Sequence, residues 1–504
     1  MINYSRQLIS AHESGDANAT YKLGFCYYYG IGVERDLDMS IEYYKMASEK
    51  GNEDAMIELA NCYLRGIGVC KQPAKGLELL EKCAENDNAY ACYLLGDFWV
   101  YGHDFDGFWS CETANKKAKK YYKKSAMLGY TEAEYMCGQE LYEKSSGSDE
   151  KHELAKELLL SASMKDHKDA QYELGKLYRY EKGGEKKALY WLEKSANRGV
   201  RGAVHMIADM FRDGVGVEQD YAKAIEYYSY ATSDFEQVEI DECYIKLKAQ
   251  GKSPSGKTFM PTDFETPLDI EGMSAREIFE DGLWHEKLGN LELSRALITK
   301  ARTLGYEGAY NKAGDIQQKG TQMLYVMTNN FLKKFAIDYY MGSAKKGDAY
   351  AQRMVAQLYE HCKEMENAEE WYEKSANNGD AVAMHKLGMF YENGLGTVKS
   401  KPKAVEWIEK SAICGYFWAQ LHLSTLFDEG DGVEKDKVKA FEWMEKSANQ
   451  GYSHACELLG QIYEHGVGVE KSKEKALEYY EKALDGFGHI NAPTIKSAIQ
   501  RVKT

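Results

Sequence analysis

Proline and long apolar segments are both scarce in this sequence. Only 6 of its 504 residues are proline, and half of these, Pro254, Pro261 and Pro267, fall within one short stretch. Because proline interrupts helices, its scarcity elsewhere suits a chain that is helical over most of its length. No apolar run approaches the ~18 residues of a membrane span, and residues 1–15 lack the basic and then apolar pattern of a signal peptide. We therefore expect a cytoplasmic protein that does not contact membranes.

Positive charge is in deficit as well. The chain has 64 lysine and arginine residues against 79 aspartate and glutamate residues, so its formal net charge is −15. Binding to nucleic acid depends on basic residues that displace counterions from the phosphates. We therefore expect neither DNA nor RNA as a partner.

Regular metal-ligand and disulfide patterns are missing too. The 11 cysteines are odd in number and form no pair that recurs at a fixed spacing, and several stand where related stretches carry small core residues. Such cysteines are typical of packing in a reducing compartment. The histidines form no H-x-x-x-H set, and there is no C-x-x-C motif. The sequence therefore predicts no metal and no cofactor.

A unit of two helices is repeated along the chain, and its clearest copy spans residues 452–487. Apolar residues recur there at three- and four-residue spacing in two successive segments, as in two amphipathic helices. Gly466 and Gly468 lie between the segments, where the chain must turn back. Two such helices cannot bury their apolar faces alone, so neighbouring units must stack on them. The stripes are Ala455, Leu458, Leu459, Ile462 and Tyr463, then Ala476, Leu477, Tyr480, Ala483 and Leu484.

The alanine that begins the first helix of each unit gives the period. Most of these alanines are 32 to 42 residues apart, but one step, from Ala203 to Ala275, is 72 residues and therefore marks a degenerate repeat. The period predicts a solenoid of about twelve repeats. The alanines are Ala19, Ala55, Ala91, Ala133, Ala170, Ala203, Ala275, Ala309, Ala351, Ala383, Ala419 and Ala455.

The break in the period sets the expected domains. We predict a repeat array over residues 1–235 and a second array over 274–487. Between them, residues 236–273 hold a degenerate repeat, in which 236–250 can form a helix, and a loop rich in proline, glycine and serine. Residues 488–504 form a capping helix with one apolar stripe and a polar outer face. An insertion at 103–113 and the loop at 252–272 are alternative binding elements.

The recurring string resembles a known family. Several copies approach A-x-x-x-L-G-x-x-Y-x-x-G-x-G-V followed by K-A-x-x-W/Y-x-x-K-S-A-x-x-G, as in AMHKLGMFYENGLG from Ala383 and KAFEWMEKSANQG from Lys439. This pattern is similar to that of Sel1-like repeats, which are related to tetratricopeptide repeats. The resemblance implies an all-α, right-handed solenoid of stacked antiparallel helix pairs. It also implies a scaffold or adaptor role, although some cysteine-rich relatives have been linked to β-lactam chemistry.

One motif points to catalysis. Residues 251–258, GKSPSGKT, satisfy the phosphate-binding pattern G-x-x-x-x-G-K-[ST], in which Lys257 and Thr258 would hold a nucleotide and its magnesium. A phosphate loop needs a strand before it and a helix after it. Here the preceding residues read as helix, and two prolines follow, so we interpret the motif as a linker.

The surface positions of the first helices are the candidate binding site. In arrays of this kind the first helices line the concave side, and four positions are not needed for core packing: those two before, two after, and five and six after the leucine of the L-G pair. The position two before the leucine is mostly tyrosine in the N-terminal repeats, and the other three positions add further aromatic and basic residues. Tyrosines give large contact area at low entropic cost. The predicted partner-binding residues are Tyr21, Phe25, Tyr28, Tyr93, Tyr101, Tyr135, Tyr142, Tyr172, Arg179 and His205.

The sequence thus predicts a non-enzymatic scaffold that binds a protein or peptide along its concave helix face. Two alternatives remain open. A homo-oligomeric structural protein would follow if an uncapped end of the array paired with a copy of itself. An enzyme would follow if residues 251–258 bound a nucleotide, or if the chain acted on β-lactams as suggested for the cysteine-rich relatives.

Overall fold

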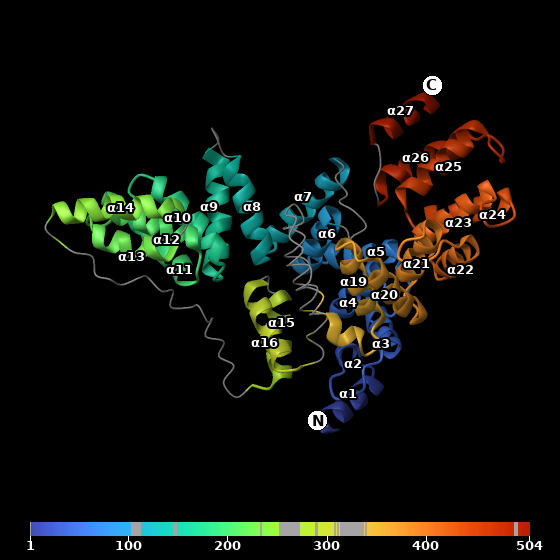
Figure 1. The fold of residues 1–504 in the computed structure, drawn as a ribbon, viewed down its shortest axis with the longest axis horizontal. Coiled ribbons are helices and arrows are strands. Elements are labelled where there is room, and N and C mark those ends of the chain that lie inside the picture. The colour runs from blue at the N-terminus through green and yellow to red at the C-terminus, as the bar shows by residue number, and fades with distance from the viewer. Residues whose placement is uncertain are drawn as a thin grey trace. The chain divides into compact units, whose positions relative to one another are not determined.

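The computed structural model describes residues 2–101, 112–144, 149–231, 234–250, 273–287, 291–306, 340–487 and 492–503, with isolated positions between 252 and 337. These residues are helical almost throughout, and among them the isolated parallel bridge between Tyr452 and Phe487 is the only extended pairing (Figure 1). Within the described ranges of each unit, successive helices pack as pairs, and neighbouring pairs pack on one another. The chain is an all-α solenoid of stacked helix pairs, as predicted.

The helices fall into two compact units. Unit 1 contains residues 1–121 and 301–504, and unit 2 contains residues 122–300. The predicted division into 1–235, 236–273, 274–487 and 488–504 rests on the break in the repeat period, and it stays a prediction. None of the helices in the described ranges is both long enough and apolar enough to cross a membrane.

Unit 1 begins with α1 (Ile2–Glu13), α2 (Ala17–Tyr29), α3 (Leu37–Glu49), α4 (Glu53–Arg65), α5 (Pro73–Glu85) and α6 (Ala89–Tyr101). It continues with α19 (Ala349–His361), α20 (Met365–Asn377), α21 (Ala381–Asn393), α22 (Lys401–Ile413), α23 (Phe417–Glu429), α24 (Lys437–Asn449), α25 (Ser453–His465), α26 (Lys473–Asp485) and α27 (Ala492–Lys503).

Unit 2 contains α8 (Thr131–Glu143), α9 (Asp149–Met164), α10 (Lys168–Tyr180), α11 (Glu185–Asn197), α12 (Arg201–Asp213), α13 (Tyr221–Ala231), α14 (Asp234–Ala249) and α15 (Ala275–Lys287). Two helices, α7 (Glu112–Met127) and α16 (Leu291–Thr303), include the unit boundaries. The helix expected at 236–250 is therefore present as α14, and the expected C-terminal helix is present as α27.

Glycine ends the first helix of the regular repeats. Gly66 and Gly466 both follow their helices with φ of 71°, and each donates its backbone N–H to the carbonyl four residues earlier. This left-handed conformation costs glycine little and costs other residues more, so the recurring glycine stops the helix and turns the chain toward the second helix. The turn predicted at Gly466 and Gly468 is confirmed, since both glycines have a positive φ.

The serine of the recurring K-S-A triplet joins the two helices of a repeat. Ser195 Oγ donates to the carbonyl oxygen of Lys168 at 2.8 Å, and Ser447 Oγ donates to that of Phe417 at 2.9 Å. In both cases the acceptor is the first residue of the preceding first helix, whose carbonyl lies beside the last turn of the second helix. The serine is fully buried, so the bond satisfies a hydroxyl that would otherwise be costly to bury.

Tryptophans at one position of the second helices pack against the core or beneath a lysine of the same helix. Trp191 is 6% exposed and belongs to the core of unit 2. Lys446 covers the ring of Trp443 at 3.7 Å, and both residues lie on α24 three positions apart. The lysine stem and charge thus shield the side of the ring that the core leaves open.

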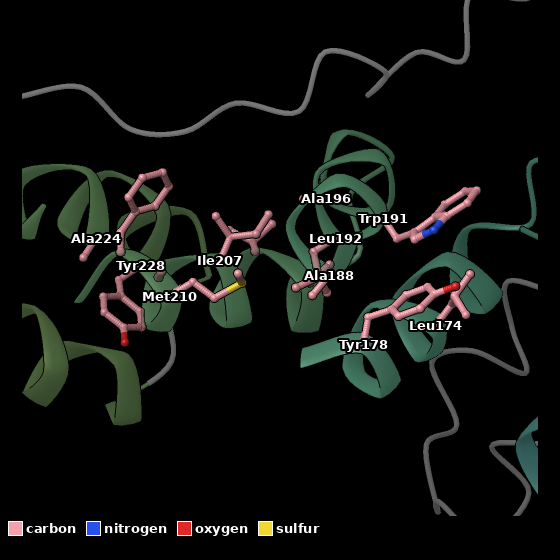
Figure 2. Close-up of a cluster of buried hydrophobic side chains, with 14 of the residues drawn as sticks. Leu174, Tyr178, Ala188, Trp191, Leu192, Ala196, Ile207, Met210, Ala224 and Tyr228 are labelled. Carbon is pink, nitrogen blue, oxygen red and sulfur yellow. The ribbon is translucent and has the colours of Figure 1, made fainter. Parts of the chain in front are cut away.

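The core of unit 2 runs continuously through its repeats. Figure 2 shows Leu174 and Tyr178 near Trp191, then Leu192, then Met210 farther along. Each second helix therefore contributes side chains to the first helices on both sides, which is how a solenoid without a central core stays folded.

Two predicted features lie outside the described residues. They are positions 103–111 of the insertion at 103–113 and the motif at 251–258, apart from Lys252.

Candidate functional site

The predicted binding residues of α2 are covered by other parts of unit 1. Tyr21 is 7% exposed and shares a hydrophobic cluster with Tyr350 and Met354 of α19, and Phe25 and Tyr28 pack against the same cluster. Burial raises the pKa of the Tyr28 hydroxyl well above its usual value. The α2 segment of the predicted site is therefore part of a core within unit 1.

An ion pair supports the same contact. Arg35, in the turn after α2, pairs with the carboxylate of Asp348, which also caps the start of α19 by accepting from Ala351 N–H at 2.6 Å.

Of the other predicted residues in unit 1, Tyr93 on α6 is buried, with 8% of its surface exposed. The side chain of Tyr101 is not among those that the structure describes.

The predicted residues of unit 2 are more accessible. Tyr135 on α8 is half-buried, and its ring stacks on His167 with centroids 4.5 Å apart. His167 is fixed in turn, because it accepts from Ala170 N–H at the start of α10 and contacts Glu132 at 3.1 Å. Burial, followed by the nearby charge of Asp169, raises the pKa of the Tyr135 hydroxyl.

Tyr172 on α10 lies across the next first helix. A Cβ atom added at Gly202 would fall 2.9 Å from both Cζ and the hydroxyl oxygen of Tyr172, so the glycine at the start of α12 makes room for this ring. Lys176, one turn farther along α10, places its ammonium 5.4 Å from the ring centre. Tyr142, at the end of α8, packs partly buried against the core of unit 2.

Charged residues continue the same face beyond the tyrosines. Arg179 on α10 contacts Asp209 on α12 at 3.4 Å, and His205 on α12 contacts Glu239 on α14 at 3.0 Å. Arg212 joins the two pairs, because it contacts Asp209 at 3.1 Å and Glu239 at 3.5 Å.

The ligand atoms of His205, Asp209 and Glu239 lie within 4.8 Å of one another, which is close enough to surround a metal ion. However, two arginines already contact these carboxylates, and Tyr228 donates to Asp209 at 2.6 Å. A cation would have to compete with the guanidinium groups for the same oxygens. The geometry therefore favours an ion-pair network that joins three first helices.

We call the face formed by Tyr135, Tyr142, Tyr172, Arg179 and His205 the first-helix surface of unit 2. It combines aromatic rings from α8 and α10 with a charged network from α10, α12 and α14. Sequence reasoning found these five residues from their repeat position. It missed Asp209 and Glu239, although the i, i+4 spacing of His205 and Asp209 was a usable signal.

The family of the chain follows from comparison with known repeats. A model of the Sel1 repeat matches residues 17–52, 53–88, 89–130, 131–167, 168–200, 202–233, 349–380, 381–416, 419–452 and 453–486. These matches cover more than half of the chain, so the protein belongs to the Sel1 repeat family. Proteins built from Sel1 repeats are generally protein-interaction scaffolds without catalytic activity of their own.

Solved structures with a similar chain include bacterial repeat proteins. A protective antigen of uropathogenic Escherichia coli displaying an SLR fold is 24% identical, with 99% of this chain and 90% of that chain covered and a TM-score of 0.38. A Sel1 repeat protein from Oxalobacter formigenes is 25% identical, with coverage of 44% and 87% and a TM-score of 0.34. An immunity protein from Pseudomonas aeruginosa is 23% identical, with coverage of 50% and 88% and a TM-score of 0.25. Among curated proteins, no match was found.

Proposed function

We propose that the protein is a non-enzymatic adaptor that binds a polypeptide partner on the first-helix surface of unit 2. The observation that carries the proposal is the pairing of half-buried tyrosines with a fixed support. Tyr135 is held by its stack on His167, and Tyr172 by its contact with Gly202. Rings that are held in place lose little entropy when a partner covers them, and tyrosine and arginine are frequent energetic anchors of interfaces.

The charged end of the surface would set the orientation of the partner. Arg179 and Arg212 share the carboxylate of Asp209, and a partner carboxylate that replaced one of these contacts would be recognised in a defined register. Rim charges of this kind change specificity and association rate more than affinity. We therefore assign most of the affinity to the tyrosines and the choice of register to the network.

We further propose a cytoplasmic location. The 11 cysteines of the sequence form no pair that recurs at a fixed spacing, and six of the described ones are buried, as is common in a reducing compartment.

Affinity capture with paired variants tests the proposal. The tagged protein is compared with the double variant Tyr135→Ala/Tyr172→Ala, and with Tyr190→Ala as the matched control. Tyr190 is 51% exposed but lies on α11, a second helix, so its loss removes a surface tyrosine without altering the proposed surface. Each anchoring tyrosine is worth about 1–2 kcal/mol, so the double variant should bind its partner at least about tenfold more weakly.

The proposal fails if the control and the double variant retain the same near-stoichiometric partner, or if the partner is lost equally from both. Far-ultraviolet circular dichroism and the unfolding midpoint of each variant separate loss of binding from loss of folding. If the double variant is folded as well as the control and still binds normally, then the tyrosines serve packing alone.

A further inference from the structure

A pocket between two successive first helices of unit 1 lies outside the proposed binding surface. It has a volume of about 260 Å³ and is formed by α21, α23 and the residue that precedes α25. The volume is below the ~300–1,000 Å³ typical of small-molecule sites, and it suits one large side chain. The lining residues are His385, Met389, Trp418, Leu421, His422, Thr425 and Tyr452.

The walls of this pocket are aromatic and supported from behind. The rings of Trp418 and Tyr452 lie 6.0 Å apart, and His385 meets the edge of Trp418 at 6.4 Å. Trp418 is 36% exposed whereas His385 is only 3% exposed, so the tryptophan forms the open side and the histidine the floor. Tyr416 also packs against His385, with ring centroids 5.5 Å apart.

The floor is polar but uncharged. His385 Nε2 lies 3.2 Å from His422 Nδ1, and His422 Nε2 lies 3.5 Å from a carboxylate oxygen of Glu392. If His422 donates toward Glu392, its Nδ1 accepts the N–H of His385, and the three groups form one chain. Burial, and then the neighbouring His422, lower the pKa of His385 well below its usual value, so its ring is neutral. A neutral floor under aromatic walls suits an aromatic side chain better than a cation.

The rim around the pocket is acidic. The leucine of the recurring motif is Leu387 in α21, Leu423 in α23 and Leu459 in α25. In these three helices, no lysine or arginine occupies the surface positions that lie two before and two, five and six after that leucine. They carry instead Glu392, Asp428, Glu429, Glu457 and Glu464. Glu464 is neutralised by Arg501, but Asp428 and Glu429 are exposed on the last turn of α23. The corresponding positions of unit 2 include Lys176 and Arg179, so the two surfaces differ in charge.

We propose that this pocket holds the aromatic side chain of a basic polypeptide segment, with flanking lysines or arginines against the acidic rim. The aromatic anchor would lie between Trp418 and Leu421 and displace water from the floor. The basic flanks would supply attraction that weakens as salt is added. This site shares no residue with the first-helix surface of unit 2, so the two proposals succeed or fail separately.

Binding of a synthetic peptide to the full chain tests this proposal. The probe is a fluorescein-labelled pentapeptide with a central tryptophan between pairs of lysines, and anisotropy is measured at two salt concentrations. We expect the peptide with alanine at its centre to bind about tenfold more weakly, as expected for one buried aromatic anchor. A peptide with glutamates in place of the lysines should not bind measurably.

Variants of the protein locate the binding. Thr425 is an exposed pocket residue, and Thr425→Lys places a positive charge and a longer side chain at its edge, so binding should fall about tenfold or more. Asn449→Lys is the matched control, because Asn449 is exposed on the second helix α24 and the charge change is the same. Equal binding by Thr425→Lys and Asn449→Lys would overturn the proposal, as would equal affinity for the tryptophan and alanine peptides. The variant Tyr135→Ala/Tyr172→Ala should bind this peptide as the parent does.

Discussion

Adding one methyl group at Gly175 should destabilise α10 and α11, although the same change usually stabilises a helix. Gly175 lies inside α10, and a Cβ atom there would fall 2.7 Å from Cγ and 2.8 Å from Cδ2 of Leu192 on α11. Carbon atoms prefer separations of about 3.5–4.0 Å, so Leu192 or the helix itself would have to move by roughly 1 Å. Leu192 is fully buried in the core of unit 2, so it cannot relieve the overlap by turning toward solvent.

The two opposing effects set the expected magnitude. Replacing glycine by alanine within a helix gains about 1 kcal/mol of helix propensity. Overpacking of a filled core costs about 1–3 kcal/mol. We therefore expect Gly175→Ala to lower the free energy of unfolding of this region by up to about 2 kcal/mol.

A double variant reverses the sign. In a Leu192→Ala background the atoms that clash with the new methyl group are absent, and Gly175→Ala should then stabilise by about 1 kcal/mol relative to Leu192→Ala alone. Hydrogen exchange of the α10 and α11 amides is the suitable assay, because a long repeat array need not unfold in one step. If Gly175→Ala stabilises the parent as much as it stabilises the Leu192→Ala variant, the close helix approach is not what requires glycine.

Three further changes test other contacts of unit 1. Arg353 is fully buried and pairs with Asp380 at 2.9 Å, so Arg353→Ala should lower the stability measured by hydrogen exchange of the α19 and α21 amides by about 3–5 kcal/mol. The double variant Arg353→Met/Asp380→Asn should recover most of this loss, and equal losses in both variants would contradict a desolvated pair. Arg501 on α27 holds the pKa of Glu464 at about 2, below the unfolded value of roughly 4.3. The contribution of this pair to the free energy of unfolding is therefore complete above the unfolded pKa, and it is lost as the pH falls toward 2. The stability difference between the parent and Glu464→Gln should shrink over that interval, and a pH-independent difference would refute the assignment. Ser411→Ala should cost about 1 kcal/mol through the bond to the Ala381 carbonyl, measured by exchange of α21 and α22 amides, and unchanged protection would count against it.

The sequence predicts the repeat architecture well because each repeat is decided locally. Helix periodicity fixes which face is buried, and the turn at Gly466 requires a positive φ that glycine adopts readily. The pattern of Trp443 and Lys446 is likewise local, since both residues lie on the same helix. Such features recur in each copy, so one clear repeat is enough to interpret the others.

The accessibility of the candidate site could not be predicted in the same way. Tyr21 and Tyr135 occupy the same position in their repeats, yet Tyr21 is buried against α19 residues far along the chain whereas Tyr135 remains half-exposed. The position of a residue in its repeat determines on which face of the helix its side chain lies. Packing against segments distant in the sequence determines whether that side chain is buried. The pocket at His385 and Trp418 was missed for a related reason, because its residues come from different repeats and no single copy contains the pattern.

Site-specific photocrosslinking tests the central claim most directly. Benzoylphenylalanine is placed at Tyr172, on the first-helix surface of unit 2, and at the exposed Tyr190 of α11 as the control. Irradiation in an extract of the native cells should join one polypeptide to the protein from position 172 and leave position 190 without that product. Equal crosslinking from both positions, or none from position 172 in a folded protein, would contradict the assignment of this surface to partner binding.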